Sequence, residues 1–255
     1  MLCATSGFKG ASVVASDGWV GTFKDFLFDP ETWRIRWVVV DTGSWLPGRK
    51  VLIHPSVIAP LDIAPRHGLP MMTGDHALSL SVRLTRGQIE ASPRVREDEP
   101  ISQQVESRVY EYYGWDPNWG TSYFGLIAVA EPLSPPPKVA DAPGSDPHLR
   151  NLTAVTHYHV HATDGDIGHV ANFLVDDVNW DIRYLVVGTS NWWPGKHVLL
   201  APYAVQEIDW SERHVRLDVT RDQVKSSPPW DPIAMIDQIS EQRLHSHYGW
   251  PGYGW

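Results

Sequence analysis

The chain has 255 residues, a formal net charge of -9, a single cysteine and an apolar share of 42%. This composition is typical of a soluble globular protein, and the acidic balance argues against nucleic acid as a partner, because phosphate binding needs clustered Lys and Arg. The sequence contains no apolar run of roughly 18 residues and no signal peptide at its N-terminus, so we expect a cytoplasmic protein without a membrane span. Cys3 alone cannot form an internal disulfide.

A long internal repeat dominates the sequence. A shift of 147 positions aligns residues 17–55 with residues 164–202 without a gap, and 18 of the 39 aligned residues are identical. Further along the chain the shift falls to 135, so the first copy carries twelve extra residues, at about 65–76. A repeat of this length, present twice, predicts two homologous domains rather than a solenoid of short units.

The domain boundaries follow from the repeat and from the composition between the copies. We predict a first domain over 1–115, a linker over 116–150, a second domain over 151–250 and an aromatic tail over 251–255. The stretch 117–151 contains seven prolines, which favours an extended linker.

Within each copy, the apolar residues alternate as in β-strands. The first clear strand is predicted over 33–39, with Trp33, Ile35, Trp37 and Val39 on one face and Arg34 and Arg36 on the other. The second copy repeats this pattern over 180–186. We expect about six short strands per copy, which curl into a small barrel or half-barrel because open sheets of this size would expose their edges.

Helices are predicted after the strands of each copy. Thr85 and Gln88, like Thr220 and Gln223, have the spacing of a capping box that opens a short helix. A second helix is predicted from Ile101, Val105, Val109 and Tyr112 with Gly114 at its end, and in the second copy from Asp231-Pro232 onward. Each domain is therefore predicted to be mainly β, with short helices at its C-terminal end.

Several motifs of the two copies resemble the PRC-barrel family, which is named for the cytoplasmic domain of the photosynthetic reaction-centre H subunit. The matching motifs are Asp17-Gly18-Trp19-Val20-Gly21, Trp45-Leu46-Pro47-Gly48-Arg49-Lys50-Val51-Leu52, their counterparts at 164–168 and 192–199, and the pair Tyr113-Gly114-Trp115 and Tyr248-Gly249-Trp250. The resemblance covers both copies. It implies two PRC-type β-barrels, and it implies contacts with a larger assembly, for example membrane-associated electron-transfer machinery.

The resemblance supplies no catalytic residues and no cofactor. The expected function is therefore a non-catalytic interaction or adaptor module, with the two barrels packed as a pseudo-dimer. Peripheral association with a membrane is compatible with this interpretation, and the protein partner is unknown. The linker is long enough to return the second copy to any face of the first.

Three histidines form the most unusual local motif. In a strand, His157, His159 and His161 would point the same way at about 7 Å spacing, which suits a shared metal ion. The alternative is that Tyr158 and Val160 point inward while the histidines face solvent, and this reading is preferred. A histidine-based metal-binding protein or enzyme remains the second hypothesis, and a small-molecule sensor with a groove between the barrels is the third.

One motif approaches the pattern of a phosphate loop, Gly43-Ser44-Trp45-Leu46-Pro47-Gly48-Arg49-Lys50. However, Arg49 occupies the position at which the pattern requires Lys, and a strand pattern follows instead of a helix. Nucleotide binding is therefore not expected.

Tryptophans in turns and near the C-terminus are the predicted interaction residues. Trp45, Trp192 and Trp193 lie in turns, where a large aromatic side chain either covers a barrel end or anchors a contact. Trp250, Tyr253 and Trp255 belong to a glycine-rich aromatic segment that resembles a docking arm.

Overall fold

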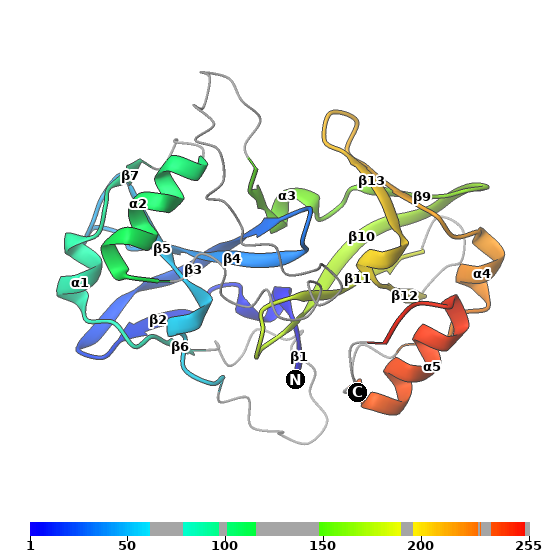
Figure 1. Ribbon diagram of the computed structural model, residues 1–255, viewed down its shortest axis with the longest axis horizontal. Helices are drawn as coiled ribbons and strands as arrows, with labels where there is room; N and C mark the ends of the chain where they lie inside the picture. The colour runs from blue at the N-terminus through cyan, green and yellow to red at the C-terminus, as the bar shows by residue number, and fades with distance from the viewer. Residues whose placement is uncertain are drawn as a thin grey trace, which may run out of the picture.

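The structure is a computed structural model that describes residues 1–61, 79–96, 101–115, 148–189, 196–228, 230 and 236–252. Over these residues the fold is mainly β, as predicted, with two sheets and short helices around them (Figure 1). None of the helices in this part of the chain combines the length and apolar character that crossing a membrane requires.

The first sheet is built mainly from the first copy. Its strands follow the order β6-β2-β3-β4-β5-β7, and β8 pairs with β3 outside this path. Strands β2 and β6 are parallel, and the other pairs are antiparallel. The bounds are β2 (Ser12–Ala15), β3 (Gly18–Asp29), β4 (Arg34–Asp41), β5 (Arg49–Ile53), β6 (Ser79–Ser81), β7 (Val95–Arg96) and β8 (Arg150–Asn151).

The second sheet repeats this arrangement. Its order is β12-β11-β10-β9-β14-β13, and β1 pairs with β10 outside this path. Strands β9 and β14 are parallel, in the same place as β2 and β6 of the first sheet. The bounds are β1 (Leu2–Ala4), β9 (His159–Ala162), β10 (Gly165–Asp176), β11 (Ile182–Gly188), β12 (His197–Leu200), β13 (Val205–Asp209) and β14 (His214–Leu217).

The shared strand order matches the sequence repeat. Among the described residues, no strand pairing joins the two ends of either sheet, so closure into six-stranded barrels stays a prediction. Most of the predicted linker, residues 116–147, lies outside the described residues.

The helices begin where the sequence signals predict. Thr85 caps α1 (Arg86–Ala91) and Thr220 caps α4 (Arg221–Lys225), both through complete capping boxes. Helices α2 (Gln103–Tyr113) and α5 (Gln238–Tyr248) end at a glycine in the left-handed region. Four short helical elements complete the set in the described residues: η1 (Thr5–Phe8), η2 (Pro55–Val57), α3 (Leu152–Val155) and η3 (Pro202–Ala204).

One helix prediction needs correction, and the start of another lies outside the described residues. Helix α5 begins after its cap at Asp237, whereas the predicted start at 231–232 lies outside the described residues. On α2, Tyr112 is 40% exposed and Tyr110 is buried in its place. Val105 and Val109 are buried as predicted.

The predicted faces of strand 33–39 are also partly wrong. Trp33 lies before β4 with a φ of 56°, and a register shift interrupts the pairing of β4 with β3 next to Ile35. Ile35 and Val38 pack in the central core, whereas Trp37 and Val39 face the cluster beneath α2. A bulge adds one residue to a strand. The added residue reverses the face of the sheet to which the following side chains point.

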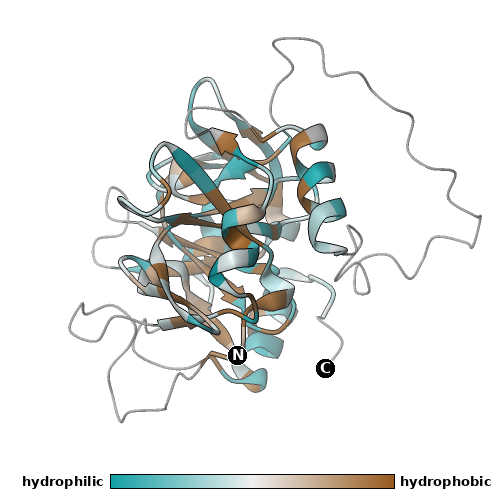
Figure 2. Cartoon of the chain, turned by 90° about the vertical axis from the view of Figure 1, so that its left-hand side faces the viewer, coloured by the Kyte–Doolittle hydropathy of each residue, from teal (hydrophilic) through white to brown (hydrophobic). Residues whose placement is uncertain are grey.

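The central core is continuous between the two copies. The ring of Trp180 lies 5.9 Å from Phe26 and 6.1 Å from Phe8, although these residues come from different copies. Smaller apolar clusters lie beneath α2 and α5. Figure 2 shows hydrophobic residues concentrated on the strands in the middle of the molecule. Burial of one shared interior is thus the main force that holds the two sheets together.

Candidate functional site

A row of histidines crosses the second sheet. His197 pairs with Gly188 on β11, Gly188 pairs with His169 on β10, and His169 pairs with His159 on β9. His159 pairs in turn with His214 on β14, and their rings are 5.6 Å apart. Directly opposed residues point to the same face of a sheet, so the four imidazoles, here called the histidine row, share one face.

All three histidines of the motif that the sequence singled out lie at this row, and the ring of His157 stacks 6.1 Å from that of His169. His159 belongs to the row, and His161 lies beside it, with its ring 4.5 Å from that of His214. His157 precedes β9 with a φ of 74°, so the three histidines do not form one straight strand as predicted. Tyr158 is buried, as the preferred interpretation required.

One carboxylate joins the histidines. Nδ1 of His161 contacts a carboxylate oxygen of Asp166, which is the residue opposite it on β10. Nε2 of His161 has no hydrogen-bond partner among the described residues. The sequence analysis missed this carboxylate, because a cross-strand neighbour is revealed only by the register.

The surroundings of His169 in this row disfavour a positive charge on its imidazole. Burial lowers the pKa of His169, and the neighbouring His157, His159 and His197 lower it further. Within the described ranges, no group of three or more His, Cys, Asp or Glu side chains is arranged to hold a metal ion.

The two Tyr-Gly-Trp motifs have a packing role. The rings of Tyr113 and Trp115 stack at 4.0 Å, and those of Tyr248 and Trp250 stack at 4.1 Å. The intervening glycine, with positive φ, turns the chain back so that the two rings meet. Trp250, a predicted interaction residue, therefore contacts the core within its own chain.

Each long helix places a glutamate against an aromatic side chain of its sheet. Glu106 accepts a hydrogen bond from Trp37 Nε1 at 2.5 Å, and its other oxygen lies 2.5 Å from Nε2 of His148. In the second copy, Glu241 accepts from the Tyr184 hydroxyl at 2.9 Å. These contacts attach α2 and α5 to the sheets.

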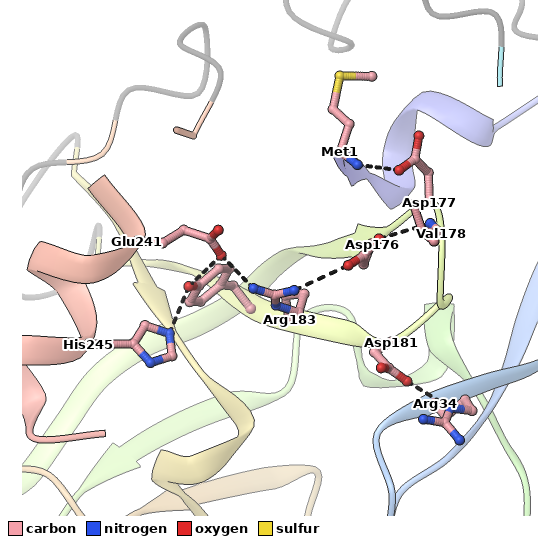
Figure 3. A network of polar contacts seen from close by, with 10 residues as sticks. Met1, Arg34, Asp176, Asp177, Val178, Asp181, Arg183, Glu241 and His245 are labelled. Carbon is pink, nitrogen blue, oxygen red and sulfur yellow. Dashed lines mark hydrogen bonds and ion pairs between the residues drawn. The ribbon is translucent and has the colours of Figure 1, made fainter. Parts of the chain in front are cut away.

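Figure 3 shows the second of these networks. Arg183 donates to Asp176 at 3.2 Å and to Glu241 at 3.0 Å. His245 approaches the Tyr184 hydroxyl from α5, with its Nε2 at 2.9 Å. Burial lowers the pKa of His245. The network lies between α5 and the second sheet and joins them.

The turn around Pro47 carries a shallow hollow. Its volume is about 340 Å³, and all of its lining residues come from the first copy: Leu46, Pro47, Gly48, Arg49, Arg94 and Val95. The guanidinium of Arg49 donates to the backbone carbonyl oxygens of Ile89 at 3.0 Å, Glu90 at 2.8 Å and Ser92 at 2.7 Å. Arg49, the first residue of β5, therefore caps the C-terminal end of α1.

Of the remaining predicted interaction residues, only Trp45 is described. The guanidinium of Arg86 lies 4.5 Å from the centre of its ring, and the indole packs partly against the core. Trp192, Trp193, Tyr253 and Trp255 lie outside the described residues.

Comparisons with protein-family models and curated proteins do not assign this mainly β chain to a family. No protein-family model matches the sequence, and no curated protein matches it significantly.

Proposed function

We propose that the protein is a non-catalytic interaction module of the PRC-barrel type, in which two barrels pack as a pseudo-dimer. The resemblance of the motifs supports the family, and it also supports a cytoplasmic setting and contacts with a larger, electron-transfer or membrane-associated assembly. The shared strand order of the two sheets is consistent with two related barrels. No substrate or cofactor forms part of the proposal.

The hydrogen bonds accepted by three buried carboxylates are the observation that best supports a non-catalytic role. Asp25 accepts hydrogen bonds from Thr153, Glu106 accepts one from Trp37, and Asp181 accepts one from Arg34. Each of these bonds joins segments that are distant in sequence. A buried carboxylate used in this way stabilises the fold.

The exposed histidine row is the contact surface that we propose. Aromatic rings with polar edges suit protein contacts, because each offers an apolar face and a hydrogen-bonding nitrogen. His159 is exposed, and His169 and His214 are half-buried, so the row is accessible on one face of the sheet.

An affinity purification with tagged full-length protein tests this proposal. We expect wild type and a His247→Ser control to retain the same partner, and a His159→Ser/His214→Ser variant of unchanged melting temperature to lose it. A Trp192→Ala/Trp193→Ala variant tests the predicted turn contacts in the same way. Identical retention by wild type and all variants would refute both surfaces.

A second candidate function is binding of a divalent transition metal. Asp166 orients the imidazole of His161, and this arrangement is typical of metal-ligating histidines. The ring of His214 lies 4.5 Å away, so two imidazoles could bind one Zn²⁺ whose other ligands are water.

Zinc titration followed by thermal unfolding tests the metal proposal. We expect zinc to raise the melting temperature of wild type and of His247→Ala by several degrees, and to leave His161→Ala and His214→Ala unchanged. If zinc has no effect on wild type, this second candidate is wrong.

A further inference from the structure

The two copies exchange their N-terminal strands. Strand β1, at the start of the chain, pairs with β10 of the second sheet, and β8, at the start of the second copy, pairs with β3 of the first. Ala4 lies opposite Leu174, and the residues 147 positions away, Asn151 and Leu27, also lie opposite each other. The exchange is therefore reciprocal, as in a two-fold symmetric dimer.

The segments that follow these strands are held in equivalent ways. Asn172 donates to Ser6 Oγ at 2.7 Å and accepts from the Thr5 hydroxyl at 2.8 Å. Asp25, which corresponds to Asn172, accepts from the backbone N–H of Thr153 at 3.2 Å and from its hydroxyl. Each copy thus uses one polar side chain on its longest strand to hold the N-terminal segment that belongs to the other.

The two sheets also meet at a pair of equivalent positions, one at the start of β4 and one just before β11. Arg34 and Asp181, which are 147 residues apart, form an antiparallel bridge between β4 and the start of β11. The backbone N–H of Ile35 donates to Trp180 O at 2.9 Å, and that of Ile182 donates to Trp33 O at 2.8 Å. Because these bonds repeat under the 147-residue shift, the approximate two-fold axis passes through this bridge.

A residue on a two-fold axis faces its own equivalent. If both copies carried the same residue here, the pair would be Arg–Arg or Asp–Asp. The chain instead carries opposite charges, and Arg34 Nε donates to Asp181 Oδ1 at 2.8 Å (Figure 3). The flanking residues are identical in both copies, Trp33 with Trp180 and Ile35 with Ile182.

Because both side chains are buried, the signs of their charges strongly affect the stability of this contact. The side chains of Arg34 and Asp181 are 6% and 11% exposed. Two like charges in such a place would repel each other, whereas opposite charges offset part of the desolvation of both groups.

We infer that the seam between the copies is a heterotypic recognition surface, in which the first half of a chain selects a second half and rejects its own kind, and that Arg34 and Asp181 make this selection. The partner is the second half of the same chain or, by exchange, the second half of another copy of this chain. This inference does not depend on the proposed function, because it rests on the contacts of the seam alone.

Full-length variants test the role of the pair. Arg34→Asp and Asp181→Arg each place like charges on the axis, and we expect each to raise the unfolding equilibrium constant by roughly 100-fold. The double variant Arg34→Asp/Asp181→Arg restores opposite charges and should recover to within about tenfold of wild type. As a control, Arg216→Glu breaks an exposed pair with Glu207 and should have an effect below about fivefold.

Co-expression tests partner selection directly. Arg34→Asp chains carry acid at both positions and Asp181→Arg chains carry arginine at both, so complementary seams form only between the two chains. The chain between residues 115 and 148 can span up to about 100 Å, which permits such an exchange. We expect the two differently tagged variants to co-purify as a one-to-one dimer, whereas two differently tagged wild-type chains stay apart.

Two results would overturn the inference. One is a double variant no more stable than the single variants, because the pair would then not act through its charges. The other is co-purification of the two variants at the level seen for wild type with wild type, because the pair would then not select the partner.

Discussion

Substitution of Gly168 by alanine gives the sharpest test of the packing between β10 and β11. Gly168 has a φ of +146°, and a Cβ atom on it would lie 1.9 Å from the carbonyl oxygen of Gly188 on the neighbouring strand. Real contacts of this kind are essentially never below 3.0 Å, so the two strands would have to separate by about 1 Å. Gly21, the equivalent residue of the first copy, meets Asp41 O at 2.1 Å in the same way.

The expected loss of unfolding free energy has two contributions, the steric contact and the positive φ. Overpacking a tight contact costs about 1–3 kcal/mol, and the positive φ adds about 1–2 kcal/mol for a residue with a Cβ. We therefore expect Gly168→Ala to lose roughly 2–5 kcal/mol of unfolding free energy, measured by urea denaturation, and to lower the melting temperature by roughly 10 °C.

Gly10→Ala is the matched control. Gly10 has a φ of +76° but nothing within 4 Å of the added Cβ, so this variant carries the backbone term alone, about 1–2 kcal/mol. If Gly168→Ala were no less stable than Gly10→Ala, the close approach of the two strands would be wrong.

Two further predictions concern buried titratable groups. Burial raises the pKa of Cys3 to about 12, and its side chain is 1% exposed, so the thiol should resist alkylation at about pH 8 in the native protein and react in urea. Rapid native-state labelling, followed by mass spectrometry, would contradict the docking of β1 on the second sheet. Burial lowers the pKa of His245, so the folded state resists its protonation and stability should fall as the pH drops below about 6.5, until the lowered folded-state pKa is passed. His245→Gln should show a smaller loss between about pH 7.5 and 5 in urea titrations, and an equal loss would contradict this assignment.

The repeat in the sequence predicted much of the architecture. Residues 17–55 and 164–202 keep their apolar pattern because each copy must fill the same positions of the same sheet. The structure confirms a mainly β chain with matching strand orders, and the capping boxes at Thr85 and Thr220 confirm the helix starts. Local signals of this kind act over a few residues, so they can be recognised without knowledge of the fold.

The histidine row could be predicted only in part. His159 and His161 stand two residues apart, which is visible in the sequence, and they do share a face with other histidines. His169, His197 and His214 join them through strand pairing, and pairing depends on register. A single bulge changes that register, as it did for the predicted face of strand 33–39.

The amino-acid sequence by itself determined that the chain is a duplication, that each copy is mainly β, and where its capped helices α1 and α4 begin, because these properties depend on composition and on neighbours within a few residues. Only the tertiary structure decided that β1 and β8 exchange between the copies and that Arg34 faces Asp181. The reason is physical: these contacts join residues up to 174 positions apart, as for Leu2 and Asp176, and are fixed by burial of a shared core that no local pattern encodes.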